Sequence, residues 1–169
     1  VLRRLILADS HRIAELANNR SISRNTLSIP HPYTLDDAKT WIGTHEDNFK
    51  ENRVYDYGII DKASNKVVGV VGLSNYQNYR GELGYWIGES YWNQGYASEA
   101  SNLILKHAFE DLGYNRVYAR HIASNPNSGK VMQKIGMTYE GLQVEHERVD
   151  GKFEDILLYG ITKSQYTKK

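Results

Sequence analysis

Cysteine is absent from the 169 residues of this chain, and its absence excludes disulfides, thiolate nucleophiles and cysteine-ligated zinc together. No apolar run approaches the roughly 18 residues that a membrane-spanning helix needs. The first residues, Val1 to Leu5, lack the apolar stretch of a signal peptide. A cytoplasmic location is therefore expected.

No linker rich in proline or glycine divides the chain, and we expect a single domain over residues 1–169. Hydrophobic residues make up 40% and charged residues 24%, which is ordinary globular usage and excludes wholesale disorder. A chain of this length can bury one core without disulfides or metals.

Neither sign of charge dominates, because 21 basic residues and 20 acidic ones leave a net charge of +1. This balance argues against a protein whose main task is to grip nucleic acid or an acidic membrane. His146-Glu147 begins a zinc-binding His-Glu-x-x-His string, but Asp150 stands where the second histidine is needed. We therefore expect no catalytic metal, no direct nucleic-acid partner and no membrane partner.

Apolar periodicity and turn residues predict an α+β or mixed α/β sheet domain. Strands are expected over residues 1–7, 54–60, 66–73, 82–87, 115–122, 137–149 and 152–161. Helices are expected after the capping residues Asp9 and Ser10, after Thr34, after Gly95 and after Asn125. The strands between residues 54 and 87 are joined by short turns, which favours an antiparallel meander.

Three local signals set boundaries within this pattern. Thr34 and Asp37 approximate a capping box at a helix start. Gly136 is typical of a helix C-terminus. Asp150-Gly151 lies between two strand patterns and predicts a tight hairpin turn.

The most informative stretch runs from Gly84 to Gly88 and on from Tyr91 to Ala100, where a strand breaks and a helix starts. The first turn of a helix has backbone N–H groups without internal partners, so it can bind phosphate. Gly95 permits close approach of a ligand to the backbone. The stretch lacks the lysine of a P-loop and the glycine spacing of a dinucleotide fingerprint. In the alternative interpretation, Gly95 only starts a helix that packs on the sheet.

This stretch resembles the pyrophosphate-binding loop of the GNAT superfamily of N-acetyltransferases. Three further segments resemble its branch of ribosomal-protein alanine/serine N-terminal acetyltransferases, namely residues 29–34, 125–128 and 136–141. The superfamily loop has Arg or Gln, two residues, Gly, one residue, then Gly or Ala. Gly95 and Ala97 fit that pattern, whereas Trp92 occupies the Arg/Gln position.

The resemblance implies acetyl-CoA as donor, a primary amine as acceptor, and a mostly antiparallel sheet whose parallel strands 82–87 and 115–122 splay apart. Pantetheine would lie in that gap and pair with strand peptide groups. The side chains of Tyr85 and Trp86 are expected in the core, with only their backbones binding. The expected coenzyme-binding residues are Tyr85, Trp86, Ile87, Asn93, Gln94, Gly95, Tyr96, Ala97, Ser98, Asn125, Ser128, Lys130 and Lys134.

Several of these residues also have a purely structural interpretation. Asn125 can serve as a helix N-cap before Pro126, the residue favoured at the first helical position. Lys130 and Lys134 can form a solvated helix face instead of meeting the coenzyme's phosphates. Many superfamily members protonate the leaving thiolate with a tyrosine, but Met132 occupies that position here.

The resemblance offers Ser128 as the proton donor and Glu147 as the general base, with Glu82 ranked second. Glu140 and Glu145 are weaker alternatives. A backbone N–H near residues 86 and 87 would stabilise the developing oxyanion. Direct transfer in a ternary complex is expected, since no cysteine is present to carry the acetyl group.

Three hypotheses for the acceptor stay open at this point. The first is the α-amine of a protein N-terminus, for example of a ribosomal protein, and the second is a small amine such as a polyamine, an amino acid or an aminoglycoside. The third is a CoA-binding module without catalysis. The acceptor pocket is expected around Tyr33, Trp41 and the terminal hairpin, and that hairpin could also pair two subunits into a homodimer.

Overall fold

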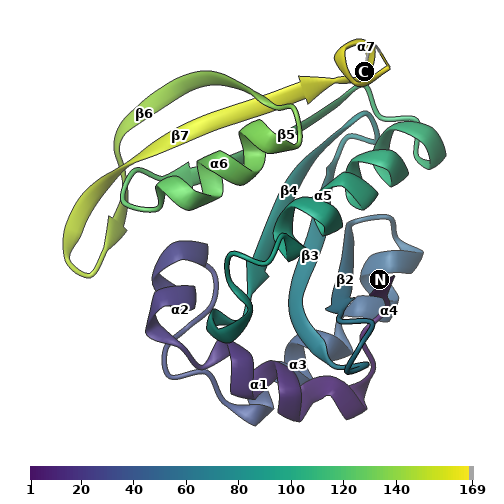
Figure 1. Ribbon diagram of the computed structural model, residues 1–169, viewed down its shortest axis with the longest axis vertical. Coiled ribbons are helices and arrows are strands. Elements are labelled where there is room, and N and C mark those ends of the chain that lie inside the picture. Colours follow the sequence, from purple (N-terminus) through teal and green to yellow (C-terminus); the bar gives the residue numbers. More distant parts are fainter. Residues whose placement is uncertain (168–169) are drawn as a thin grey trace.

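A computed structural model describes residues 1–167 and shows a seven-stranded sheet in the order β1-β2-β3-β4-β5-β7-β6 (Figure 1). The strands are β1 Leu2–Arg3, β2 Val54–Ile60, β3 Val67–Tyr76, β4 Arg80–Ile87, β5 Arg116–Ile122, β6 Thr138–Val149 and β7 Lys152–Thr162. All neighbouring pairs are antiparallel except β4 and β5, which are parallel. The expected mixed sheet with one parallel pair is confirmed.

Helices cover both faces of the sheet. They are α1 Ser10–Ala17, α2 Arg20–Thr26, α3 Leu35–Gly43, α4 His45–Lys50, α5 Tyr96–Lys106, α6 Pro126–Lys134 and α7 Lys163–Tyr166. One core cluster joins α5 and α6 to the sheet through Ile104 and Met132, and a second joins α1 and α3 to the other face through Ile13 and Ile42. Within residues 1–167, none of the helices is long and apolar enough to cross a membrane.

The strands β4 and β5 separate after a short paired stretch. Their register runs from Arg80 opposite Arg116 to Glu82 opposite Tyr118 and then ends. Both strands continue, β4 to Ile87 and β5 to Ile122. The unpaired ends therefore leave peptide groups of β4 facing a gap in the sheet, where an extended ligand can take the place of a strand.

The three boundary signals are confirmed. Thr34 and Asp37 form a complete capping box, in which each side chain accepts a backbone hydrogen bond from the other residue. Gly136 ends α6 with a φ of 91°. Asp150 and Gly151 both have positive φ, which is the geometry of the tight hairpin turn that matches strand twist.

The predicted N-terminal strand is wrong beyond Arg3, because the chain turns into a short 3-10 segment at Leu7. Asp9 causes this turn: its carboxylate accepts hydrogen bonds from the Arg3 guanidinium and the Ile6 backbone N–H. The expected capping of α1 by Asp9 is therefore wrong as well, since the side chain makes no capping hydrogen bond there.

The helix α2 was not predicted, because its sequence has no apolar stripe and only Ile22 is buried in it. Asn19 starts the helix by accepting hydrogen bonds from the backbone N–H groups of Ser21 and Ile22. Leu27 ends it in the left-handed conformation. The helix is therefore defined by its caps and its tertiary contacts rather than by periodicity.

Candidate active site

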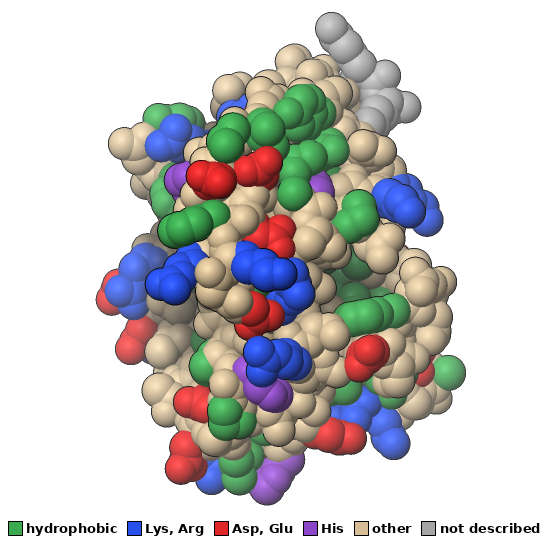
Figure 2. All heavy atoms as spheres, turned by 90° about the vertical axis from the view of Figure 1, so that its left-hand side faces the viewer, with side chains coloured by type: hydrophobic (Ala, Val, Ile, Leu, Met, Phe, Trp, Pro, Cys, Tyr) green, Lys and Arg blue, Asp and Glu red, His purple; other side chains and the backbone are tan. Residues whose placement is uncertain are grey.

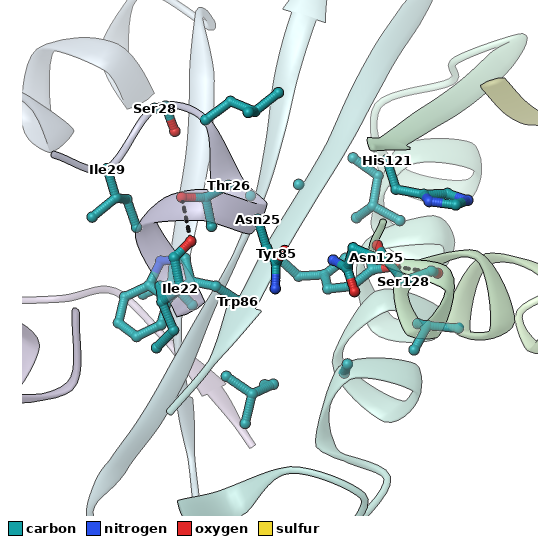
Figure 3. A pocket seen from close by; sticks show the side chains of 18 of the residues that line it. Ile22, Asn25, Thr26, Ser28, Ile29, Tyr85, Trp86, His121, Asn125 and Ser128 are labelled. Atoms are coloured by element: carbon teal, nitrogen blue, oxygen red, sulfur yellow. Dashed lines mark hydrogen bonds between the residues drawn. The ribbon is translucent and has the colours of Figure 1, made fainter. Parts of the chain in front are cut away.

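A cavity of about 1320 Å³ opens beside the gap between β4 and β5. Residues of α2 and α3 line it, and so do residues of α6 and β6. Figure 3 shows Tyr85 of β4 in its middle, with Ile22, Asn25 and Thr26 of α2 on one side and Asn125 and Ser128 on the other. The cavity is also lined by α3, by the turn before α5 and by Glu147 of β6. Tyr33 and Trp41, expected around the acceptor, line it too.

The turn before α5 presents a run of backbone donors. Gly95 has a φ of 87°, and no side chain caps the helix that follows. In the described part of the chain, the backbone N–H groups of residues 93–98 have no hydrogen-bond acceptor. Unpartnered N–H groups at a helix N-terminus fit a diphosphate.

Side chains of this turn fasten it to the sheet and leave its backbone free. The Tyr96 hydroxyl donates to Asp61 Oδ1 at 2.8 Å. The hydrogen bond from the Ser64 hydroxyl, together with this bond from Tyr96, lowers the pKa of Asp61 to about 2. Trp92, at the superfamily's Arg/Gln position, donates its indole N–H to the Ile87 carbonyl at 2.7 Å. Gln94 donates to the Ser90 carbonyl and does not line the cavity.

Peptide groups of β4 alternate between the neighbouring strand and the gap. The Trp86 carbonyl lies against Gly69 of β3, and the Gly88 N–H donates to the Val68 carbonyl at 2.8 Å. Since alternate residues direct their peptide groups to the same side, Tyr85 and Ile87 face the gap and Trp86 does not. The expectation that all three backbones are available there is therefore wrong for Trp86.

The side chains of Tyr85 and Trp86 pack against the two core clusters as expected, but they are only half-buried and they also line the cavity. The Tyr85 hydroxyl donates to the Ser128 carbonyl at 2.9 Å and lies 3.0 Å from Ser128 Oγ. Burial raises the pKa of Tyr85 to about 12, so its hydroxyl is neutral at physiological pH. This contact bridges β4 and α6 and holds the Ser128 hydroxyl at the cavity wall.

Asn125 begins α6 without capping it, because its side chain makes no capping hydrogen bond. The amide lies at the cavity wall instead (Figure 3). Lys130 and Lys134 are exposed at the rim of the same cavity. Met132, at the superfamily's tyrosine position, is buried in the core.

Both carboxylates expected as general base lie at the cavity and share one arginine. Arg120 Nε donates to Glu82 Oε1 at 2.8 Å, and its Nη1 lies 3.9 Å from Glu147 Oε1. Glu82 also lies near the hydroxyls of Tyr76 and Tyr118, at 3.5 and 3.4 Å. The lone pairs of Glu82 are therefore more fully occupied than those of Glu147.

A bulge in β6 positions Glu147. Gln143 pairs with Ile156, but Glu147 pairs with Glu154, so the three residues between oppose a single residue of β7. Glu145 takes a φ of 48° in this bulge, and its N–H donates to Asp155 Oδ1 at 2.7 Å. Bulges commonly redirect side chains near active sites.

The weaker candidates are placed away from this centre. Glu140 is held by the guanidinium of Arg116, and the pair lowers the pKa of the Glu140 carboxyl. Glu145 is exposed, and neither glutamate lines the cavity. Neither carboxylate therefore lies at the cavity that holds Glu82 and Glu147.

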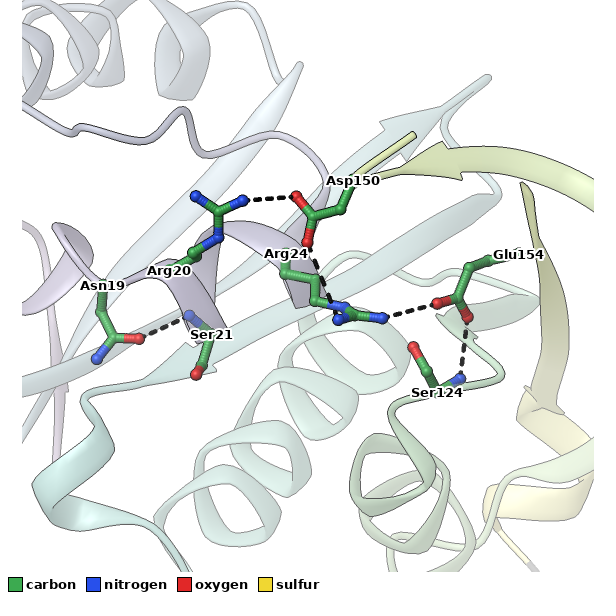
Figure 4. A network of polar contacts seen from close by, with 7 residues as sticks. All are labelled: Asn19, Arg20, Ser21, Arg24, Ser124, Asp150 and Glu154. Carbon is green, nitrogen blue, oxygen red and sulfur yellow. Dashed lines mark hydrogen bonds and ion pairs between the residues drawn. The ribbon is translucent and has the colours of Figure 1, made fainter. Parts of the chain in front are cut away.

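Two arginines of α2 connect this helix to the opposite side of the cavity. Arg24 contacts Asp150 and Glu154 of the hairpin, and Arg20 contacts Asp150 (Figure 4). Glu154 also accepts the N–H of Ser124 at 3.2 Å. These contacts join α2 to the segments that carry Glu147 and Asn125, and no local pattern in the sequence signalled them. Figure 2 shows acidic and basic side chains interspersed on this side of the molecule.

A sheet that splits between two parallel strands, next to a helix start with free N–H groups, defines a site of the class that binds acyl-coenzyme A thioesters beside a nucleophile. The comparisons agree with this class. Residues 1–138 match the model of the acetyltransferase (GNAT) domain. The chain therefore belongs to the GNAT acetyltransferase family and is an N-acetyltransferase that uses acetyl-CoA.

Several relatives are similar to the chain over most of its length. An uncharacterized N-acetyltransferase p20 of Bacillus licheniformis is 27% identical, over 98% of this chain and 93% of the relative. The ribosomal protein uS5 alanine N-acetyltransferase of Escherichia coli is 24% identical, over 75% of this chain and 66% of the relative. The spermidine N-acetyltransferase of Vibrio cholerae, solved with CoA and spermine, is 25% identical with a TM-score of 0.85, over 99% of this chain and 97% of that chain.

Proposed function

We propose that the chain transfers the acetyl group directly to the α-amine of a peptide or protein N-terminus. The observation that supports this acceptor is the engagement of both candidate bases by Arg120. An α-amine has a pKa of about 7.7–8.0 and needs only modest help to lose its proton, whereas an alkyl amine near 10.4 needs much more. A site without a free strong base therefore suits the α-amine.

Each residue then has a distinct task. Acetyl-CoA supplies a thioester whose carbonyl carbon accepts the amine nitrogen and whose sulfur leaves. Glu147 takes the proton of the amine, directly or through a water, because its lone pairs are less occupied than those of Glu82. The N–H groups of residues 93–98 hold the diphosphate, Asn125 faces the pantetheine, and the N–H of Ile87 or Tyr85 faces the developing oxyanion.

Ser128 donates a proton to the leaving sulfur in this proposal. The Tyr85 hydroxyl has one proton, which it donates to the Ser128 carbonyl or to Ser128 Oγ. In either arrangement the Ser128 hydroxyl proton can point into the cavity. The buried Met132 offers no proton at the position of the superfamily's tyrosine.

The relatives support two acceptor classes. The name of the Escherichia coli relative specifies an alanine of ribosomal protein uS5, and the Vibrio cholerae structure contains spermine. A test that separates them follows free thiol release from acetyl-CoA with a panel of peptides that begin with Ala or Ser, polyamines and aminoglycosides. Release with peptides whose α-amine is free, and not with the N-acetylated versions, is expected. Release with small amines alone would assign the second class, and CoA binding without any release would assign a binding module.

Replacing Glu147 with Gln is expected to lower kcat/KM about tenfold at pH 6 and less at pH 8, because more of the α-amine carries a proton at acid pH. CoA affinity, measured by calorimetry, should persist. Glu145→Gln on the same strand is the matched control, since Glu145 lies outside the cavity. Equal pH–rate profiles for Glu147→Gln and the native protein would remove Glu147 as the base.

Replacing Ser128 with Ala is expected to lower kcat by less than tenfold, because a thiolate is a good leaving group and can depart without a proton donor. The loss should grow as the pH rises, when solvent protons become scarce. Tyr85→Phe should weaken the same step, and the double variant should lose less than the sum of both effects, since the two groups act through one contact. Additive losses in pre-steady-state measurements of thiol release would contradict this coupling.

A further inference from the structure

Asp56 of β2 is an acidic side chain of the cavity wall that the proposed chemistry does not use. Its side chain is 17% exposed. No hydrogen-bond donor within residues 1–167 serves the carboxylate, and no lysine or arginine pairs with it there. A buried carboxylate normally has such a partner, because removing an ionised group from water is unfavourable.

The nearest titratable group does not neutralise Asp56. His45 Nε2 lies 3.8 Å from Asp56 Oδ2, and both ring nitrogens of this buried histidine lack hydrogen-bond partners among residues 1–167. Burial lowers the pKa of His45, so the ring is neutral at pH 7. Burial also raises the pKa of Asp56 to about 6, so most of the carboxylate is ionised at that pH.

The sheet leaves open space between Asp56 and the gap. Asp56 pairs with Gly72 of β3, and Gly72 pairs with Gly84 of β4, so the three residues form one row across the strands. The Asp56 carboxylate lies over Gly72, where a side chain would collide with it. A Cβ at Gly84 would meet no atom of residues 1–167 within 4 Å, apart from those of the adjoining residues. Gly72 therefore makes room for the carboxylate, and Gly84 leaves an open trough between that carboxylate and the gap on the cavity side of the sheet.

The length of this trough sets the spacing of a ligand that spans it. Neighbouring strands lie about 4.8 Å apart, so β2 and β4 are about 10 Å apart. The Asp56 carboxylate lies over Gly72 of β3, on the side of β2 that faces β4. A cation bound by Asp56 would therefore lie on the order of 5–10 Å from a nitrogen placed at the gap.

We propose that Asp56 binds a second positively charged group of the acceptor, so that the enzyme selects acceptors with two cationic groups. This inference rests on the proposed acetylation of an amine bound in the same cavity. An ammonium or guanidinium group can pair with the unpartnered carboxylate through charge-assisted hydrogen bonds. It can come from a basic side chain close to a peptide N-terminus or from the second amine of a small diamine.

The test compares acceptors that differ only in the second charge. One pair is the peptides Ser-Lys-Ala-Gly and Ser-norleucine-Ala-Gly, and the other is 1,4-diaminobutane and butylamine. With the native protein, the charged member of at least one pair should have a kcat/KM at least tenfold higher, mainly through KM. In Asp56→Asn that ratio should fall to about one. If the charged member is preferred only in the peptide pair, the second cation is a basic side chain near a peptide N-terminus. If it is preferred only in the diamine pair, the acceptor is a small diamine.

Two further variants separate binding from folding. Gly72→Ala keeps the charge of Asp56 but displaces its carboxylate, and it should also reduce the ratio. Asp36→Asn removes an exposed carboxylate of α3 outside the cavity and should keep the native ratio. CoA affinity of each variant checks that the donor site is folded.

Failure of this inference is distinguishable from failure of the proposed function. A native ratio near one, or the same ratio in Asp56→Asn, overturns the role of Asp56 while acetylation persists. If no acceptor causes release of thiol, the role of Asp56 is tested by measuring the binding of the diamine to the CoA-loaded protein by calorimetry. Weaker binding to Asp56→Asn than to the native protein supports the site, and equal binding overturns it.

Discussion

Gly95→Val is expected to lower the affinity for CoA by at least tenfold. Gly95 has a φ of 87°, a region that a β-branched side chain enters only with strain. The valine would also stand beside the backbone donors of residues 93–98, where its Cβ would meet no atom of a more distant residue within 4 Å in the described part of the chain. Among residues 1–167 no neighbouring side chain collides with the valine Cβ, so beyond the backbone strain of a positive φ the loss falls on the approaching diphosphate.

The control for this prediction is Gly113→Val. Gly113 has a φ of 70° and is likewise free of neighbours within 4 Å of an added Cβ, but it lies beyond the other end of α5. Both variants should lose similar thermal stability, and only Gly95→Val should lose CoA affinity in calorimetry. If CoA binds Gly95→Val as tightly as Gly113→Val, the free N–H groups of this turn do not hold the diphosphate.

Features encoded by neighbouring residues could be predicted from the sequence. The capping box of Thr34 and Asp37, the glycine at Gly136 and the Asp150-Gly151 turn depend on hydrogen bonds and φ angles within a few residues. The stretch around Gly95 belongs to the same group, because a helix start is also a local feature.

Features that depend on contacts between distant segments could not be predicted. Asn125 has the residue type and spacing of a cap, but the structure places its amide at the cavity. The engagement of Glu82 and Glu147 by Arg120 joins β4, β5 and a bulged β6. The row of Asp56, Gly72 and Gly84 exists only in the register of three strands, and no local pattern encodes that register.

The unpartnered carboxylate of Asp56 also has a consequence for stability. Its pKa is raised from 3.8 to about 6 by burial, so the folded state binds this proton more tightly than the unfolded state. Such a group favours folding at low pH, and that contribution is lost as the pH rises through about 6. At pH 7.5 the ionised carboxylate destabilises the fold by about 3 kcal/mol, at 1.36 kcal/mol for each unit of the pKa shift.

Asp56→Asn is therefore expected to raise the free energy of unfolding by on the order of 2–3 kcal/mol at pH 7.5, and by only about 1 kcal/mol at pH 4.5. Denaturant unfolding of both proteins without ligands measures the difference at each pH. His45 is present in both, so its own titration largely cancels in the comparison. A pH-independent difference would show that Asp56 affects folding through packing instead of charge.

The destabilising effect of the ionised Asp56 carboxylate also predicts how a bound cation changes the stability of the protein. A dication that pairs with Asp56 binds only the folded state, so it should stabilise the native protein in proportion to its occupancy. At pH 7.5, saturating diamine or basic peptide should raise the melting temperature of the native protein more than that of Asp56→Asn. The charge-free partners, butylamine and the norleucine peptide, should shift the two proteins equally. If the dication instead raises the melting temperature of Asp56→Asn more than that of the native protein, Asp56 does not bind the acceptor, and its destabilising carboxylate has another role.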